Sequence, residues 1–295
     1  MIPPLVKPPP PTLVTCRSVL TPASGFLLGF THTLNPYMGC AWGEGGCGVY
    51  CYVAESPIGL YAGQPWGTWL RAKENAADAL RRDLASVPDR QPLRVFMSSA
   101  TDPYQPAEAK LRITRSVLEV FHAAPVGLLV VQTRSPFVEL DFDLLAEMPF
   151  AWLSMTVETD NDAVRRGLTP TCPSIERRLR TMRRARERGI RVQAAVSPTL
   201  PHDPERFSDA LAGAADRVIV DTFFGDGSDG KRTRRRPLPA RFAGLGYGDW
   251  QDISSAERLF EVLCRRIGPK RVGWSRDGFN ALALAAAAGS EVPYA

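Results

Sequence analysis

Three cysteines, Cys40, Cys47 and Cys51, lie within twelve consecutive residues of a glycine-rich stretch. Thiolates gathered on so short a loop are the ligands that proteins use for zinc and for iron–sulfur clusters. Three protein ligands leave one coordination position open, and an open position is where a substrate or cofactor can bind a metal. We therefore take this loop as the candidate centre of the protein's chemistry.

The spacing of the three cysteines, Cys-x6-Cys-x3-Cys, is wide, and glycines supply much of the added length: Gly43, Gly45, Gly46 and Gly48. Glycine lets the backbone detour and still bring the sulfurs together. A second interpretation is a structural zinc site whose fourth ligand is one of the three histidines, His32, His122 or His202. The Cys-x-x-Cys pairing typical of zinc sites is absent, which favours iron–sulfur.

Strands and helices alternate along the chain after the cysteine loop. We predict helices over 69–85, 108–123, 140–148, 174–188, 203–214 and 254–266, and strands over 93–98, 127–132, 151–157, 190–196, 217–221 and 271–274. With one more strand just before Cys40, this pattern predicts an α/β protein: a partial (βα)6-type barrel of parallel strands, short of the eight units of a closed barrel. Ligands gather at the C-terminal ends of such strands, where the cysteine loop falls.

The composition is that of an ordinary globular protein, with 44% hydrophobic and 23% charged residues among 295 and a net charge of +5. No apolar stretch reaches the length of a membrane span. The proline-rich beginning carries no export signal, so we expect a cytoplasmic protein with reduced thiols. Cys16, Cys172 and Cys264 are expected to be buried side chains rather than ligands.

We divide the chain into an N-terminal extended arm over 1–27, the barrel over 28–225, and a basic loop with a C-terminal helical extension over 226–295. Two segments are strongly basic. The helix with arginines over 177–191 is expected to be a solvated outer face. The loop over 231–236 could bind phosphates or be a disordered charged loop. The mildly basic net charge is compatible with nucleic acid but does not require it.

Several stretches of the sequence together have a familiar pattern: Asn35-Pro-Tyr-Met-Gly-Cys40, Tyr52 directly after the last cysteine, Thr101-Asp-Pro-Tyr-Gln-Pro106 with Glu108, Thr133-Arg-Ser135, Ser154-Met-Thr-Val157 and Pro173-Ser-Ile-Glu-Arg-Arg-Leu179. In this combination the chain resembles the radical S-adenosylmethionine superfamily, and within it the spore photoproduct lyase-like branch. The resemblance spans roughly residues 30–225. One departure is the loop itself, because the usual superfamily spacing is Cys-x3-Cys-x2-Cys.

The resemblance implies an enzyme in which Cys40, Cys47 and Cys51 hold a 4Fe–4S cluster whose fourth iron binds S-adenosylmethionine. Reduction by a flavodoxin- or ferredoxin-like donor would cleave the cofactor to a 5′-deoxyadenosyl radical, which abstracts hydrogen from a substrate. True photoproduct lyases carry a cysteine that returns hydrogen, and Ser99 stands at about that position here. We therefore do not expect photoproduct lyase activity, and nucleic acid is one candidate substrate.

Polar residues at the strand ends are the candidates for binding S-adenosylmethionine. Thr101 and Asp102, in the run that begins at Ser98 and includes Ser99, could accept hydrogen bonds from the cofactor's ammonium. Alternatively, Asp102 caps the turn that follows. Arg134 could pair with the cofactor's carboxylate, or form a structural ion pair with a loop acid.

Ser154, Thr156 and Glu158 alternate along one strand and so share a face, where they could bind the ribose or carboxylate or simply be solvated. Tyr52 and Trp42 could pack over the cluster or the adenine, or fill the core. Weaker candidates for the adenine side are Gln193, Ser197 and Pro198.

The sequence assigns no catalytic residue. Two hypotheses from other classes stay open beside the enzyme. One is a metal-containing nucleic-acid-binding protein without catalysis, and the other is a scaffold that has lost its cluster.

Overall fold

The computed structural model describes residues 10–42, 45–222, 238–248 and 253–290. The first part of the predicted N-terminal arm, the basic loop over 231–236, and Gly43 lie outside the described residues. What we predict for those segments therefore stays a prediction. None of the described helices combines the length and the apolar character needed to cross a membrane.

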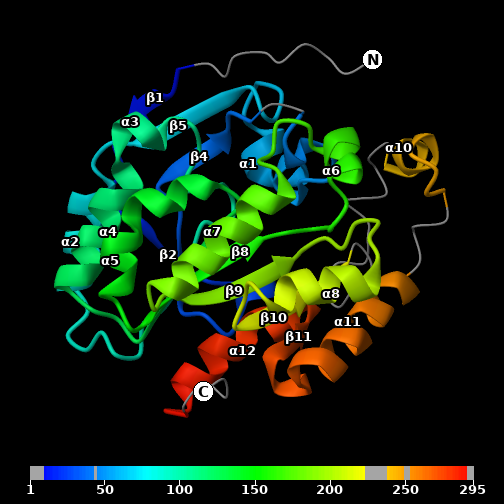
Figure 1. Ribbon diagram of the computed structural model, residues 1–295. Helices are drawn as coiled ribbons and strands as arrows, with labels where there is room; N and C mark the ends of the chain where they lie inside the picture. The colour runs from blue at the N-terminus through cyan, green and yellow to red at the C-terminus, as the bar shows by residue number, and fades with distance from the viewer. Residues whose placement is uncertain (1–9, 43–44, 223–237, 249–252, 291–295) are drawn as a thin grey trace.

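An open sheet of eight strands forms the centre of the protein (Figure 1). Its order is β11-β10-β9-β8-β7-β6-β3-β2, and every neighbouring pair is parallel except β2 with β3. The strands are β2 Leu20–Pro22, β3 His32–Leu34, β6 Arg94–Met97, β7 Leu128–Thr133, β8 Ala151–Thr156, β9 Arg191–Val196, β10 Arg217–Val220 and β11 Val272–Trp274. The predicted partial barrel with parallel strands is confirmed.

A second, three-stranded sheet carries the start of the cysteine loop. Its order is β1-β5-β4, made of Thr12–Val14, Trp69–Lys73 and Tyr37–Cys40, and Cys40 lies opposite Trp69 in the antiparallel pair. The predicted helix from residue 69 is therefore wrong over its first residues. Trp69, Leu70 and Ala72 are buried while Arg71 is exposed, and pairing on both edges of β5 overrides the helical composition. The helix itself, α2, is Ala76–Ala85.

Helices cover the outer face of the main sheet and bury its larger apolar core with side chains such as Val95, Leu129 and Val131. They include α2, α4 (Ile113–Ala123), α5 (Phe142–Ala146), α7 (Ile175–Glu187), α8 (Pro204–Ala212) and α11 (Ser254–Ile267). Shorter helices are α1 (Pro57–Leu60), α3 (Glu108–Leu111), α6 (Asp162–Leu168) and α10 (Leu238–Gly244). The helix predicted over 108–123 is thus two helices, separated by Arg112 at φ 53°.

The inner face of the sheet packs against the last helix, α12 (Ser275–Ala287), which the sequence did not predict. Phe279 and Leu282 of this helix meet Phe96, Trp152 and Ile219 in a separate apolar cluster. Figure 1 shows α12 in red below the strands, with α11 beside it. The C-terminal part is therefore divided, since α11 packs with α8 outside and α12 fills the inside.

Asn280 of α12 joins the end of the chain to its beginning. Its amide nitrogen donates to the Phe26 carbonyl at 2.8 Å, and its amide oxygen accepts the Gly29 N–H at 2.8 Å. Phe26 also packs edge-on against Phe279 of the same helix. Residues separated by some 250 positions in sequence thus close one end of the barrel interior together.

Gly39, directly before Cys40, has φ +87°, and a Cβ there would lie 2.4 Å from the Trp69 ring and 2.7 Å from the Trp69 carbonyl. Gly63 has φ +69° with nothing within 4 Å. We expect Gly39→Ala to lower the free energy of unfolding by about 3 kcal/mol or more, against about 1–2 kcal/mol for Gly63→Ala, in denaturant titrations. Equal losses in the two variants would contradict the close packing at Gly39.

Candidate functional site

The cysteine loop places its three thiols at successive local elements. Cys40 ends β4, Cys47 begins the 3-10 turn η2 (Cys47–Val49), and Cys51 precedes the turn η3 (Tyr52–Glu55). All three are free thiols and half-buried. Cys47 donates a hydrogen bond to Cys51, which raises the pKa of Cys47 and lowers that of Cys51, while burial raises the pKa of Cys40 to about 12. Among described residues, no three His, Cys, Asp or Glu side chains converge around a single-ion position.

The fully buried Gln105 holds the backbone on both sides of Cys40. Its Oε1 accepts the Ala41 N–H at 2.8 Å, and its Nε2 donates to the Gly39 carbonyl at 3.2 Å. Thr101 Oγ1 donates to the same carbonyl at 2.6 Å. Buried backbone groups need such partners, so these bonds fix where the loop starts. We did not predict a role for Gln105 by itself, although it lies in a stretch on which the resemblance rests.

Glu108 extends this anchor to helix α4. Its buried carboxylate accepts the N–H groups of Thr114 at 2.9 Å and Arg115 at 3.3 Å, which open α4 after the break at Arg112. The other carboxylate oxygen accepts the hydroxyl of Tyr37 from β4. Burial raises the pKa of Glu108, although these bonds oppose the rise. One carboxylate therefore joins the strand before the cysteines to the helix that covers the sheet.

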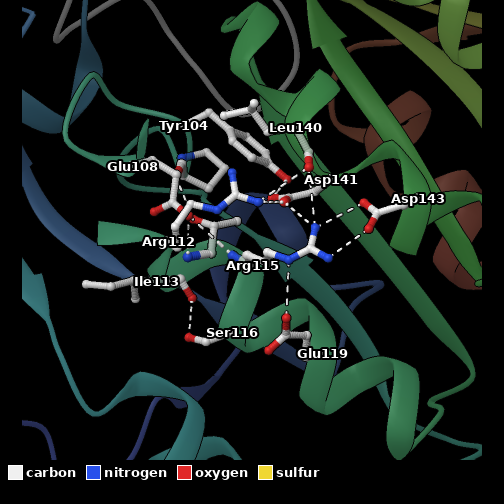
Figure 2. Close-up of polar contacts among 12 residues, drawn as sticks. Tyr104, Glu108, Arg112, Ile113, Arg115, Ser116, Glu119, Leu140, Asp141 and Asp143 are labelled. Atoms are coloured by element: carbon white, nitrogen blue, oxygen red, sulfur yellow. Dashed lines mark hydrogen bonds and ion pairs between the residues drawn. The ribbon is translucent and has the colours of Figure 1, made fainter. Parts of the chain in front are cut away.

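Asp141 closes the far side of this network (Figure 2). Its side chain accepts the Tyr104 hydroxyl at 3.0 Å and Arg112 at 2.8 Å, and Arg115 reaches the same carboxylate at 3.2 Å. Arg115 also pairs with Asp143 at 2.7 Å. The stretch 101–108 is thus held by buried polar contacts along its whole length.

Glu158, 2% exposed and just beyond β8, is the centre of a buried charge cluster. Its Oε1 accepts the Tyr50 hydroxyl at 2.9 Å and Arg134 at 2.7 Å, and its Oε2 accepts Arg178 at 2.6 Å. Burial alone would raise the pKa of Glu158, but the charges of Arg178 and Arg134 outweigh it and bring the pKa to about 2. Tyr50 lies between Cys47 and Cys51, so the cluster also ties down the cysteine loop.

Arg178 departs from the solvated outer face that we predicted for its helix. Other arginines of α7 are exposed and pair with surface acids, as Arg183 does with Glu176 and Arg184 with Glu139. Arg178 is fully buried, donates to the Thr156 carbonyl at 2.8 Å, and has two further nitrogens without a partner among the described residues. Arg178 lies in the apolar stripe of the helix together with residues 175, 179 and 182. This position is the sequence signal from which its burial could have been predicted.

The connection between α6 and α7 contacts the loop as well. The Thr171 N–H donates to the Gly45 carbonyl at 2.8 Å, and its hydroxyl donates to the Trp42 carbonyl at 2.9 Å. Cys172 is buried, as predicted, and Arg134 donates to its sulfur at 3.8 Å. Burial raises the pKa of the Cys172 thiol to about 11. That this cysteine adjoins the site could not be predicted from its isolated position in the sequence.

Six of the predicted cofactor-binding residues lie around the loop: Tyr52, Ser99, Thr101, Asp102, Arg134 and Glu158. The half-exposed Tyr52 donates through its hydroxyl to the Ser99 carbonyl. Asp102 accepts the Tyr104 N–H at 2.9 Å, the Thr133 hydroxyl at 2.7 Å and the Arg134 N–H at 2.9 Å. The bond from Tyr104 caps the turn that follows Asp102. The bonds from Thr133 and Arg134 tie this turn, which follows β6, to the end of β7. Burial raises the pKa of Asp102 against them.

The other predicted residues lie on the sheet or at its far strands. Ser154 accepts a hydrogen bond from Gln193 at 2.8 Å, and Thr156 accepts one from Gln132 at 2.6 Å. Ser197, whose bond to Pro198 is cis, donates to Asp221 at 2.9 Å. No contact between these side chains and the three cysteines is found in the described part of the chain.

The family model of the Radical SAM superfamily matches residues 34–211, from the end of β3 into α8. The chain belongs to the radical SAM superfamily. Membership confirms the resemblance drawn from the motifs and makes the protein one of a superfamily of enzymes that use S-adenosylmethionine and an iron–sulfur cluster.

Curated relatives cover parts of the chain. An uncharacterised protein of Methanocaldococcus jannaschii is 28% identical over 59% of this chain and 62% of its own length. ORF301 of Acidianus two-tailed virus is 30% identical over 69% of this chain and 66% of its own length. A radical SAM Nalpha-GlyT isomerase of Pseudomonas phage M6 is 25% identical over 80% of this chain but 43% of its own length. The chain thus spans less than two thirds of the length of each of these relatives.

Solved structures show the same fold at low identity. A mutant of spore photoproduct lyase superposes with a TM-score of 0.58 at 12% identity, covering 89% of this chain and 81% of the other. The lyase complexed with dinucleoside spore photoproduct gives 0.53 at 14%, covering 76% and 66%. Streptococcus suis SuiB bound to its precursor peptide gives 0.53 at 16%, covering 84% and 49%.

The Glu158 cluster predicts a pH dependence of stability. The folded pKa of about 2 lies below the usual value of about 4.3, so the carboxylate contributes about 3 kcal/mol above pH 4.3, which is lost as the pH falls toward 2. We expect Glu158→Gln to lose about that much at pH 7 and to show a shallower loss between pH 5 and 3, in denaturant titrations. Glu176→Gln, at an exposed ion pair, is the control. Parallel pH profiles for all three proteins would contradict the cluster's role.

The Gln105 anchor predicts a loss of both stability and metal binding. Gln105→Met leaves the Ala41 N–H and Gly39 carbonyl with fewer partners in a buried site, at about 2 kcal/mol. We expect that loss in unfolding titrations, together with a lower iron content after reconstitution. Gln91→Met, at an exposed position, should change neither. Full iron content in Gln105→Met would show that the loop keeps its shape without this clamp.

Proposed function

We propose that the protein binds a 4Fe–4S cluster through Cys40, Cys47 and Cys51 and uses it to cleave S-adenosylmethionine reductively. The observation that carries the proposal is the anchoring of one three-cysteine loop to the segments that follow the C-terminal ends of β6 and β8, where parallel α/β folds bind ligands. When bound, the cluster and S-adenosylmethionine supply a 5′-deoxyadenosyl radical that abstracts hydrogen from a substrate.

The charges around the loop fit such a group. Within the Glu158 cluster, Arg134 and Arg178 carry two positive charges against one carboxylate, and the charge of Arg134 acts on Cys47. The carboxylate of Asp102 is also close and accepts the Arg134 backbone N–H. Three thiolate ligands bring negative charge to a bound cluster. A nearby guanidinium stabilises thiolates and influences the reduction potential of the metal centre. The charge of Arg134 therefore favours the deprotonated thiols that the cluster needs.

The same residues supply positions for S-adenosylmethionine. We assign the cofactor's carboxylate to Arg134, whose bonds in the described structure all use one terminal nitrogen or the backbone. The ammonium belongs with Asp102, which has accepted three of about four possible hydrogen bonds, supported by Ser99 and Thr101. The half-exposed ring of Tyr52 is the proposed adenine platform.

The remaining predicted residues take supporting parts in this proposal. Ser154 and Thr156 sit on the inner face below the strand ends, where ribose hydroxyls would approach them. Glu158 acts as a positioning residue, because three donors already occupy its carboxylate. A flavodoxin- or ferredoxin-like protein in the cytoplasm would deliver the electron.

The substrate is not that of a true photoproduct lyase in this proposal, because Ser99 replaces the hydrogen-returning cysteine. The arginines on the described outer face of α7 that pair with acids, such as Arg183, Arg184 and Arg186, offer little unpaired charge to nucleic acid. Named relatives act on unlike molecules, as a dinucleoside photoproduct and a precursor peptide show. The reaction on the substrate is therefore left to experiment.

The test is anaerobic reconstitution with iron and sulfide, then reduction with dithionite in the presence of S-adenosylmethionine. We expect a brown protein with about four irons per chain that forms 5′-deoxyadenosine. Cys47→Ser should lose both the colour and the product, while Cys264→Ser on α11 should keep both. Cys172→Ser should also keep its iron, since this thiol lies behind Arg134 and outside the three-cysteine loop.

Two outcomes would overturn the proposal. A Cys47→Ser protein with its full iron content would remove the ligand assignment. A colourless protein that holds zinc or no metal would point to the binding-protein or scaffold hypothesis instead.

A further inference from the structure

A row of polar side chains crosses the inner face of the main sheet near the cysteine loop. Gln132 lies opposite Ser154, and Ser154 lies opposite Gln193, in the register of neighbouring parallel strands. The row continues to Arg217 on β10, which lies opposite Gln193. At the other end stands Ser98, which directly follows Met97 of β6, the partner of Val131 beside Gln132. The members of this polar row are Ser98, Gln132, Ser154, Gln193 and Arg217. Ser98 precedes Ser99, and Gln132 lies two residues before Arg134, so the row adjoins the proposed cofactor site.

One half of the polar row is internally paired. Gln193 donates to Ser154 Oγ at 2.8 Å and accepts from Arg217 at 2.8 Å. Arg217 also donates to the Gly278 carbonyl of α12 at 3.1 Å. This half therefore serves to join the strands to the helix inside the barrel.

The other half has buried atoms with no partner. Gln132 Nε2 donates a hydrogen bond to Thr156 Oγ1 at 2.6 Å, but Gln132 Oε1 is buried without a hydrogen bond to any described residue. The same holds for Oγ of Ser98, a residue 4% exposed. A buried acceptor or donor without a partner is destabilising, so two cases close together need an explanation.

Ser98 carries a second sign of function. Its φ is +74°, a left-handed conformation that is strained for a residue with a Cβ and that clusters at ligand sites. Both residues also stand at the C-terminal ends of adjacent parallel strands, the edge where ligands bind in this class of fold. Strain and unpaired atoms together indicate that something outside the chain completes this position.

We propose that Ser98 and Gln132 bind an amide edge of the substrate, a subsite that rests on the proposed function. A substrate N–H donates to Gln132 Oε1, and the neighbouring carbonyl oxygen accepts from the Ser98 hydroxyl. A trans peptide unit points its N–H and C=O in opposite directions, so ordinary peptide backbone does not present both to one side. Primary carboxamides and ring amides do, which makes them the chemical class that this pair selects.

The test measures binding of small probes to the full-length, reconstituted protein with S-adenosylmethionine present, by ligand-observed NMR. Thymidine supplies a ring amide, nicotinamide supplies a primary carboxamide, and N3-methylthymidine is the matched ring that lacks the N–H. We expect one or both amide probes to bind and N3-methylthymidine to bind at least about tenfold more weakly than thymidine, or not at all. The relative affinities of thymidine and nicotinamide distinguish the two sources of the amide edge.

Two variants separate a binding role from a structural one. Gln132→Met should weaken probe binding at least tenfold and lower the melting temperature by no more than a few degrees, because it removes one hydrogen bond, from Nε2 to Thr156 Oγ1, while the lost oxygen has no partner within the described chain. Ser98→Gly should weaken binding similarly and raise the melting temperature by a few degrees, because glycine accepts the left-handed φ. Gln91→Met, on the surface, should change neither property.

The results that would overturn this subsite are distinct from failure of the proposed function. The subsite is wrong if neither amide probe binds the wild-type protein, if the variants bind the probes unchanged, or if the variants instead lose affinity for S-adenosylmethionine. Absence of 5′-deoxyadenosine in the wild-type protein would overturn the proposed function, and the probe titrations would still report on Ser98 and Gln132.

Discussion

The candidate site depends on the hydrogen bonds that the buried carboxamide of Gln105 makes with the backbone on both sides of Cys40. The loop beyond Cys40 is rich in glycine, and such a chain loses much conformational entropy when it is ordered. Gln105 offsets part of that loss by pairing with the backbone on both sides of the first cysteine. The contacts of Tyr37 and Tyr50 with buried carboxylates then secure the strand before this point and the turn after it. These anchors come from two segments, one that follows β6 and one that follows β8, so the loop takes its shape from the barrel.

Charge is the second organising principle of the site. Burying Arg178 and Arg134 would be unfavourable without a counter-ion, and Glu158 is the acid that both of them share. Because one acid serves two cations, the Glu158 cluster carries a net positive charge of its own and favours a further anion nearby. The thiolates of the loop and the carboxylate of S-adenosylmethionine are the anions that our proposal supplies. A single residue thus links the stability of the fold to the preference of the site for negative charge.

The sequence predicted most of the parallel strands and singled out the cysteine loop, because apolar runs and cysteine spacing are local signals. It failed where a residue's environment is set by distant segments. Trp69 lies in a strand because β1 and β4 pair with both edges of β5. Arg178 is buried because it pairs with Glu158, just beyond the end of β8. The alanine-rich α12 has too weak an apolar pattern to show where it packs. The roles of Gln105 and Gln132 depend on which backbone or side chain stands opposite, which no spacing rule reveals.

The bonds from Asn280 to the segment around Phe26 have a consequence for how the molecule is made. The cysteine loop is synthesised well before α12, the helix that packs on the inner face of the sheet. Contacts so distant in sequence form late, since loop closure over the whole chain must precede them. In a growing chain the three thiols are therefore present before α12 covers the inner face of the sheet. Until α12 is made, Phe96, Trp152 and Ile219 on the inner face of the sheet lack the helix that covers them, so this surface must be shielded from aggregation by other means.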